Sequence, residues 1–143
     1  MASGNYSFLV PFWNGQYYFD KPPLYFWLSF PFFKIFGPGE WQARIVSVLA
    51  AASATLLVFL IGKKLFNRRA GVLSSLVFVT LGQVWVRFSH GNLDALLVAL
   101  FLAAFYTHLF AKQKKFAVIS GIFLGLGFLV KGWFLGLFPL AAI

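Results

Sequence analysis

Four long uncharged runs alternate with short charged connectors along most of the chain. They cover residues 45–62, 70–86, 95–111 and 116–130. Their lengths of 15 to 18 residues lie at the short end of what crosses a bilayer as a helix, and flanking Lys and Arg side chains extend their reach to the membrane surface. A buried helix of a soluble protein would explain any single run, but four in succession predict a bundle of transmembrane helices. A fifth run at 132–143 is expected to begin another span.

The segment before the first run is aromatic and too short to cross a membrane. It covers residues 24–36, and such segments tend to lie in the lipid headgroup region. A Gly-Pro-Gly turn follows, and Glu40 then opens the next helix, with Arg44 as an i,i+4 partner. This pair is explained by a helix start more readily than by catalysis. We therefore divide the chain into an outer-face region, 1–44, and a transmembrane region, 45–143.

Composition agrees with an all-α polytopic membrane protein. The chain is 61% hydrophobic and 10% charged, whereas soluble domains have about 25% charged residues, and its mean hydropathy is +0.84. The net charge of +9 does not indicate nucleic-acid binding, because the bases are few and separated by long apolar runs. Membrane lipid headgroups or a phosphate-bearing ligand are the expected partners.

The charges of the connectors predict an orientation. The connectors after the first and third runs contain seven bases and no acid, namely Lys63, Lys64, Arg68, Arg69, Lys112, Lys114 and Lys115. The other connectors carry five bases and all three acids. The positive-inside rule places the first group in the cytoplasm, and residues 1–44, 87–94 and 131 on the outer face. Because sites are built from mixed charges, we expect any site on the outer face.

An acid and a base lie side by side at Asp20-Lys21-Pro22-Pro23. The two prolines stiffen the backbone and favour an extended conformation at Lys21, so both charges are presented on a rigid turn. A stray ion pair in an interfacial loop is the simpler alternative. As a functional pair, Asp20 is a metal ligand or general base and Lys21 a phosphate ligand.

Two further segments carry candidate residues on the predicted outer face. Arg87, His90 and Asp94 fall in one connector, where Asp94 could equally open the next helix, and a His-x3-Asp spacing is a weak metal signal. Lys131 follows the glycine-rich run 121–127, whose small residues allow close helix packing. Lys131 either reaches a lipid phosphate or extends to the membrane surface.

Motifs along the whole chain, taken in order, resemble one enzyme family. They are residues 3–24 with Trp27, Glu40-Trp41-x-x-Arg44, the segment 87–97 and the segment 125–132. Together they are similar to lipid-linked glycosyltransferases of the GT-C fold, in the branch of the aminoarabinose transferase and the dolichyl-phosphate-mannose protein mannosyltransferases. Asp-Lys-Pro-Pro-Leu is the most specific of these motifs.

The resemblance implies inverting transfer of a sugar from a polyprenyl-phosphate donor to an acceptor on the outer, periplasmic face of a bacterial inner membrane. It implies catalytic roles for Asp20 and Asp94, with Asp20 also a divalent-metal position. It implies donor-phosphate binding by Lys21, Arg87 and Lys131. The chemistry agrees, because a phosphate leaving group needs positive charge and an acceptor hydroxyl needs a base.

The first 19 residues depart from the family pattern. They contain no acid, whereas relatives have an acidic outer-loop motif after an additional helix. We therefore expect a fragment of a longer enzyme that is inactive alone. The alternative is a transport or scaffold protein without chemistry, which four short spans would also suit.

Overall fold

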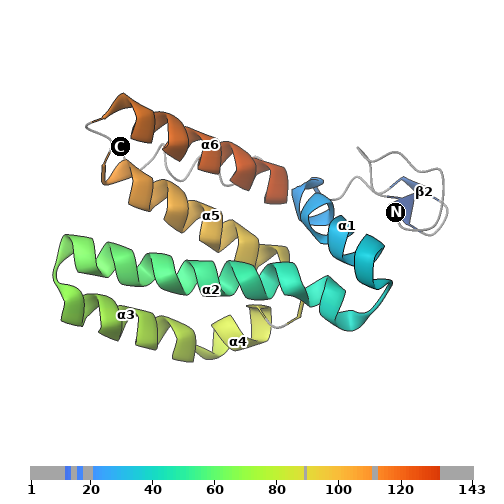
Figure 1. The fold of residues 1–143 in the computed structure, drawn as a ribbon, viewed down its shortest axis with the longest axis horizontal. Helices are drawn as coiled ribbons and strands as arrows, with labels where there is room; N and C mark the ends of the chain where they lie inside the picture. The colour runs from blue at the N-terminus through green and yellow to red at the C-terminus, as the bar shows by residue number, and fades with distance from the viewer. Residues whose placement is uncertain (1–11, 14–15, 18–20, 89, 111–112, 133–143) are drawn as a thin grey trace.

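Six helices form a bundle in the computed structural model, which describes residues 12–13, 16–17, 21–88, 90–110 and 113–132 (Figure 1). The helices are α1 (Leu24–Phe36), α2 (Glu40–Leu65), α3 (Arg68–Thr80), α4 (Gly82–Phe88), α5 (Leu93–His108) and α6 (Lys114–Lys131). Two short strands, β1 (Phe12–Trp13) and β2 (Gln16–Tyr17), pair antiparallel ahead of them.

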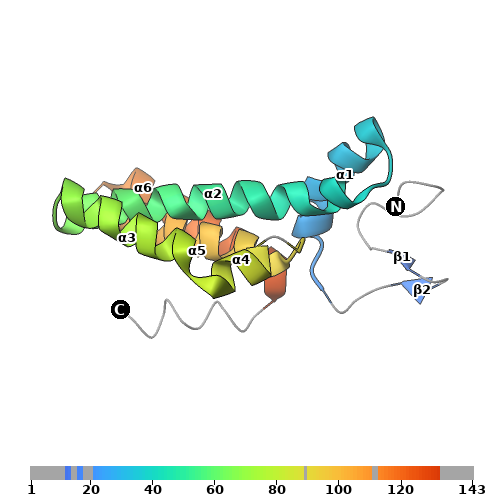
Figure 2. The same cartoon turned by 90° about the horizontal axis from the view of Figure 1, so that it is seen from below.

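Helix α2 is the central element of the bundle. Its 26 residues correspond to about 39 Å, and it contacts α1, α3, α4 and α5, while α5 in turn packs on α6 (Figures 1 and 2). The core lies between α2 and α5 and consists largely of small side chains, which let helix backbones approach closely. Its buried members include Val46, Ala50 and Ala54 of α2 and Ala95, Leu96 and Ala99 of α5.

The outside of the bundle is apolar. Many large side chains are exposed there, including Leu56, Leu73, Val77, Val118 and Ile122. Within the described residues, α2 is the helix whose length and composition suffice to cross a membrane, and α1 and α5 are shorter apolar helices. A surface of this kind suits a lipid environment better than water.

The run 70–86, expected as one helix, is two helices in the structure. Leu81 is extended, with φ −62° and ψ 125°, and separates α3 from α4. The Thr80 hydroxyl donates to the carbonyls of Leu76 and Val77, and such back-bonding bends helices. Gly82, which follows, is a poor helix former. The break directs α4 toward α2 and the start of α5.

Glycine brings α2 and α3 together. A Cβ on Gly62 would lie 2.9 Å from the Cα of Gly71, and one on Gly71 would lie 2.6 Å from the carbonyl oxygen of Phe59. Gly121 and Gly125 of α6, where the sequence favours close packing, have open space beside them. Gly127 of the same run does pack on α5, where a Cβ would lie 3.7 Å from Leu97 Cδ1, but the tighter helix contact lies at a glycine pair that the sequence pattern did not single out.

The connectors gather at two ends of the bundle (Figure 1). At the basic end, defined by residues 63–69 and 113–115, the described residues contain bases and no acid. The mixed-charge end is formed by the start of α1, the turn between α4 and α5 and the end of α6, with the start of α2 beside them. The run 132–143, expected to begin another span, lies outside the described residues apart from Gly132.

Candidate functional site

The first turn of α1 is fastened to α2 at the mixed-charge end. The Tyr25 hydroxyl donates to the carbonyl of Ala43 at 2.9 Å and lies 2.9 Å from the Ser47 hydroxyl. Tyr25 is 6% exposed, and this burial raises the pKa of its hydroxyl above the ordinary value, which the hydrogen bond with Ser47 partly opposes. The hydroxyl is therefore neutral at physiological pH and carries one proton to donate.

Ser47 links this contact to the start of α5. Its hydroxyl donates to the carbonyl of Asn92 at 2.9 Å, and the side chain of Asn92 in turn accepts from the backbone N–H of Asp94 at 3.1 Å. Asn92 is thus the N-cap of α5, and Asp94 lies in the first helical turn. A carboxylate in that position is favoured by the positive end of the helix dipole.

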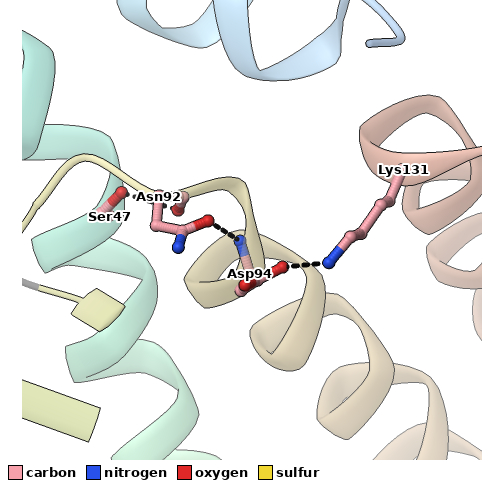
Figure 3. Close-up of polar contacts among 4 residues, drawn as sticks. All are labelled: Ser47, Asn92, Asp94 and Lys131. Carbon is pink, nitrogen blue, oxygen red and sulfur yellow. Dashed lines mark hydrogen bonds and ion pairs between the residues drawn. The ribbon is translucent and has the colours of Figure 1, made fainter. Parts of the chain in front are cut away.

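Asp94 and Lys131 form an ion pair that joins the start of α5 to the end of α6 (Figure 3). Their side chains are 24% and 43% exposed, respectively, so the pair is open to solvent and to a ligand. Figure 3 shows the sequence of contacts Ser47, Asn92, Asp94 and Lys131 running across three helices. Two of the sequence-predicted site residues are therefore in direct contact.

Lys21 lies at the same end, just before α1. Pro23 is the N-cap residue of α1, and its carbonyl accepts from the backbone N–H of Trp27 at 3.0 Å, so the Lys-Pro-Pro motif leads directly into the helix. Helix α1 contacts both α2 and α6, and its first turn lies beside the end of α6 (Figure 1). Lys21 is exposed and has no hydrogen bond or ion pair with the described part of the chain.

The remaining candidates are described less completely. Asp20 and the side chain of Arg87 lie outside the described residues, although the backbone of Arg87 is in α4. His90 is exposed, with Nδ1 at 2.8 Å from the carbonyl oxygen of Val86. The expected pair between Glu40 and Arg44 is present at 3.0 Å and is exposed.

No metal site is formed by the described residues. Among them, no group of three or more His, Cys, Asp or Glu side chains is placed to hold a metal ion. Asp20, the position to which the resemblance assigns a metal, lies outside them. The possible divalent metal at Asp20 therefore stays a prediction.

Three residues of this arrangement were not singled out from the sequence. Tyr25, Ser47 and Asn92 are neutral residues in or beside apolar segments, and their spacing carries no motif. One signal was available for Asn92, because Asn two positions before an acid at the start of an apolar run is typical of a helix N-terminus. The contact of Tyr25 with Ser47 joins residues 22 positions apart and depends on the fold.

Comparisons with known proteins agree with the motifs. The chain is 31% identical over 140 residues to the undecaprenyl phosphate-alpha-4-amino-4-deoxy-L-arabinose arabinosyl transferase of Pseudomonas savastanoi pv. phaseolicola, covering 93% of this chain and 26% of that relative. The transferase of the same name from Edwardsiella ictaluri is 28% identical over 151 residues, covering 100% and 27%. An uncharacterized protein of Aquifex aeolicus is 40% identical over 80 residues, covering 56% and 19%. The chain thus spans between about a fifth and about a quarter of the length of these relatives.

A solved structure shares the fold. The crystal structure of ArnT from Cupriavidus metallidurans in the apo state matches with a TM-score of 0.85 at 22% identity, over 92% of this chain and 26% of that one. The likeness confirms the expected fold class, an all-α polytopic membrane bundle of GT-C type.

The family model for dolichyl-phosphate-mannose-protein mannosyltransferases matches residues 20–143, which begin at the Asp-Lys-Pro-Pro motif. The resemblance seen in the motifs is confirmed by this match, and the chain belongs to the dolichyl-phosphate-mannose-protein mannosyltransferase family.

Proposed function

We propose that the mixed-charge end binds the phosphate of a polyprenyl-phosphate sugar donor, and that the protein transfers the sugar to an acceptor with inversion. The observation that carries this proposal is the convergence of Lys21, Asp94 and Lys131, which are far apart in sequence, on one end of a bundle of this family. The relatives are named for an undecaprenyl-phosphate donor of 4-amino-4-deoxy-L-arabinose. A donor of that class is the one we propose here.

Charge supports a phosphate site at this end. Lys21 is exposed, and Lys131 is partly exposed at the end of α6. Arg87 precedes the turn that leads to α5, and we assign it to the same phosphate site. A phosphate at the membrane surface is stabilised by such cations because little water screens the interaction. We propose that this end lies on the outer, periplasmic face of a bacterial inner membrane, the orientation that the count of bases favours.

The proposed reaction is a single displacement at the anomeric carbon. The acceptor oxygen attacks from the face opposite the phosphate, the bond between that carbon and the phosphate oxygen breaks, and the electron pair leaves with the polyprenyl phosphate. Lys21 and Lys131 stabilise the charge that develops on the leaving group. The proton of the acceptor hydroxyl passes to a carboxylate, for which Asp20 and Asp94 are the candidates.

The ion pair suggests how Asp94 would act. Without donor, Lys131 neutralises Asp94. A bound phosphate would compete with Asp94 for the Lys131 ammonium. Lys131 would then contact the donor, while the Asp94 carboxylate stays beside the reacting groups. The described residues form no metal cluster, and no step here uses a metal ion.

Replacement of Lys21 tests the proposal. In proteoliposomes containing the complete gene product, transfer of radiolabelled sugar from the polyprenyl-phosphate donor to acceptors in a membrane extract is measured. We expect Lys21→Gln to lower kcat/KM roughly tenfold to a hundredfold, since a hydrogen bond to a charged group is lost. Lys34→Gln is the matched control, because Lys34 is an exposed lysine in the last turn of α1, the helix that Lys21 precedes.

Two results would count against the proposal. Equal transfer by Lys21→Gln and the unchanged protein would remove Lys21 from the site. A complete gene product that inserts into membranes and releases no sugar from any polyprenyl-phosphate donor would favour the transport or scaffold alternative.

A further inference from the structure

We propose that Tyr25 is a positioning residue whose hydroxyl clamps the start of α1 to α2 and to the turn before α5. The clamp holds Lys21 at a fixed distance from Asp94 and Lys131. This inference rests on the proposed function, because its purpose is to align the donor-phosphate ligand of α1 with the ion pair of α5 and α6.

The clamp lies where α1 enters the bundle. Tyr25 is the second residue of α1 and follows Lys21 by four positions. It is 6% exposed, while the adjacent Leu24 and Phe26 are less buried. Buried hydroxyls are costly unless they are hydrogen-bonded, and Tyr25 meets this demand with two partners on α2, Ala43 and Ser47. Its position is thus specified by polar contacts as well as by packing.

The hydroxyls of Tyr25 and Ser47 share their protons among three contacts. Each hydroxyl has one proton. The Tyr25 hydroxyl contacts the Ala43 carbonyl, the Ser47 hydroxyl contacts the Asn92 carbonyl, and the two hydroxyls contact each other. Removing either hydroxyl therefore eliminates two of the three contacts and leaves one. The start of α1 and the N-cap of α5 are coupled through Ser47, whose contact with Asn92 is visible in Figure 3.

The backbone just before Asn92 also packs closely against the residues that the Tyr25 hydroxyl contacts. Gly91 has φ +66°, and a Cβ there would lie 2.8 Å from the carbonyl oxygen of Ala43 and 3.6 Å from the Tyr25 hydroxyl oxygen. A side chain at position 91 would thus push the turn away from the carbonyl that Tyr25 uses. The close approach and the hydrogen bonds act on one point, which is near Lys21 in sequence on the α1 side and near Asp94 on the α5 side.

Tyr25→Phe removes only the hydroxyl and tests the clamp. Three quantities are measured on the complete gene product in lipid nanodiscs: hydrogen exchange of the peptide covering residues 21–30, and the KM and the kcat for the polyprenyl-phosphate donor. We expect faster exchange in this peptide and a KM raised roughly threefold to tenfold, as for loss of a neutral hydrogen bond. The kcat should change less, because Lys21 is displaced and not removed.

Tyr106→Phe is the matched control. Tyr106 lies on α5 toward the basic end, where its ring contacts Phe110, and its hydroxyl has no hydrogen bond within the described residues. We expect it to leave the exchange, the KM and the kcat unchanged. Ser47→Ala tests the clamp from α2, and the double variant with Tyr25→Phe should raise KM by less than the product of the two single effects, because the two hydroxyls share one contact.

The outcomes separate the clamp from the proposed function. Unchanged exchange in Tyr25→Phe overturns the clamp, and faster exchange with an unchanged donor KM overturns its role in positioning Lys21. If the unchanged protein transfers no sugar, the proposed function fails, and the exchange measurement then decides by itself whether the hydroxyl fastens α1.

Discussion

The ion pair between Asp94 and Lys131 joins residues 37 positions apart, yet it contributes little to stability. Both side chains are partly exposed, at 24% and 43%, and exposed pairs are typically worth about 0–1 kcal/mol. Its importance is chemical. It holds a cation and a carboxylate next to each other where a phosphate and a hydroxyl are proposed to react.

Lys131→Gln should therefore separate stability from activity. We expect the free energy of unfolding to fall by less than about 1 kcal/mol and donor KM to rise roughly tenfold or more. Thermal unfolding in detergent and sugar transfer in proteoliposomes measure the two effects. The control is Arg44→Gln, which breaks the exposed pair with Glu40. Equal transfer by the two variants would show that Lys131 has no special role.

The sequence identified those site residues whose charge is unusual in an apolar chain. Asp94 and Lys131 stood out because ionised groups are rare in this chain and need a reason. Tyr25 and Ser47 did not, because a hydroxyl in an apolar helix has many uses, and only the fold reveals its partner. Charge can be read along a sequence, whereas a neutral hydrogen bond between distant residues cannot.

Helix α5 begins at the site, and helix α3 begins at the basic end, with the same kind of cap. Asn92 accepts from the N–H of Asp94 at 3.1 Å, and Asn67 accepts from the N–H of Ala70 at 2.9 Å. Such caps are typically worth about 1 kcal/mol. The two asparagines thus form a natural pair for comparing a cap near the site with one far from it.

Replacing each cap by alanine should give similar losses of stability and different losses of activity. We expect Asn92→Ala and Asn67→Ala each to lower the free energy of unfolding by about 1 kcal/mol. Asn92→Ala should also lower sugar transfer, because the N–H of Asp94 loses its acceptor and the ion pair shifts. Thermal unfolding and the transfer assay check both. The account is contradicted if Asn67→Ala reduces transfer as much as Asn92→Ala.

At the scale of elements, the apolar runs predicted where helices lie, but they did not predict where a helix is broken. Runs 45–62 and 116–130 fall inside α2 and α6. The break at Leu81 was missed because Thr80 and Gly82 are tolerated in many helices, and their effect depends on packing. The Gly62–Gly71 contact was missed for a related reason, since close packing needs a partner glycine on the facing helix.

At the scale of the whole molecule, basic connectors lie at one end of the bundle, and connectors with both acids and bases lie at the other. The basic end has bases without acids in the described residues, and the mixed-charge end holds the candidate site. The positive-inside rule predicts the direction of the spans. Which residues meet at each end follows from the helical arrangement, which the alternation of runs and connectors predicted. The arrangement of side chains between helices could not be predicted in this way.

Reporter fusions test this orientation. A fusion after residue 66, in the connector between α2 and α3, should place the reporter in the cytoplasm. A fusion after residue 90, before α5, should place it on the outer face. Enzyme reporters that are active on only one side of the membrane check both positions. The reverse pattern would put the candidate site on the cytoplasmic face and contradict the proposed location.

Binding of polyprenyl phosphate to the complete gene product in nanodiscs tests the central claim most directly, because it asks which end of the bundle holds the phosphate. We expect Lys21→Gln and Lys131→Gln each to raise the Kd roughly tenfold or more, and Lys64→Gln and Lys115→Gln, at the basic end, to leave it unchanged. Equal effects of all four variants, or a loss of binding confined to the variants of the basic end, would contradict the account.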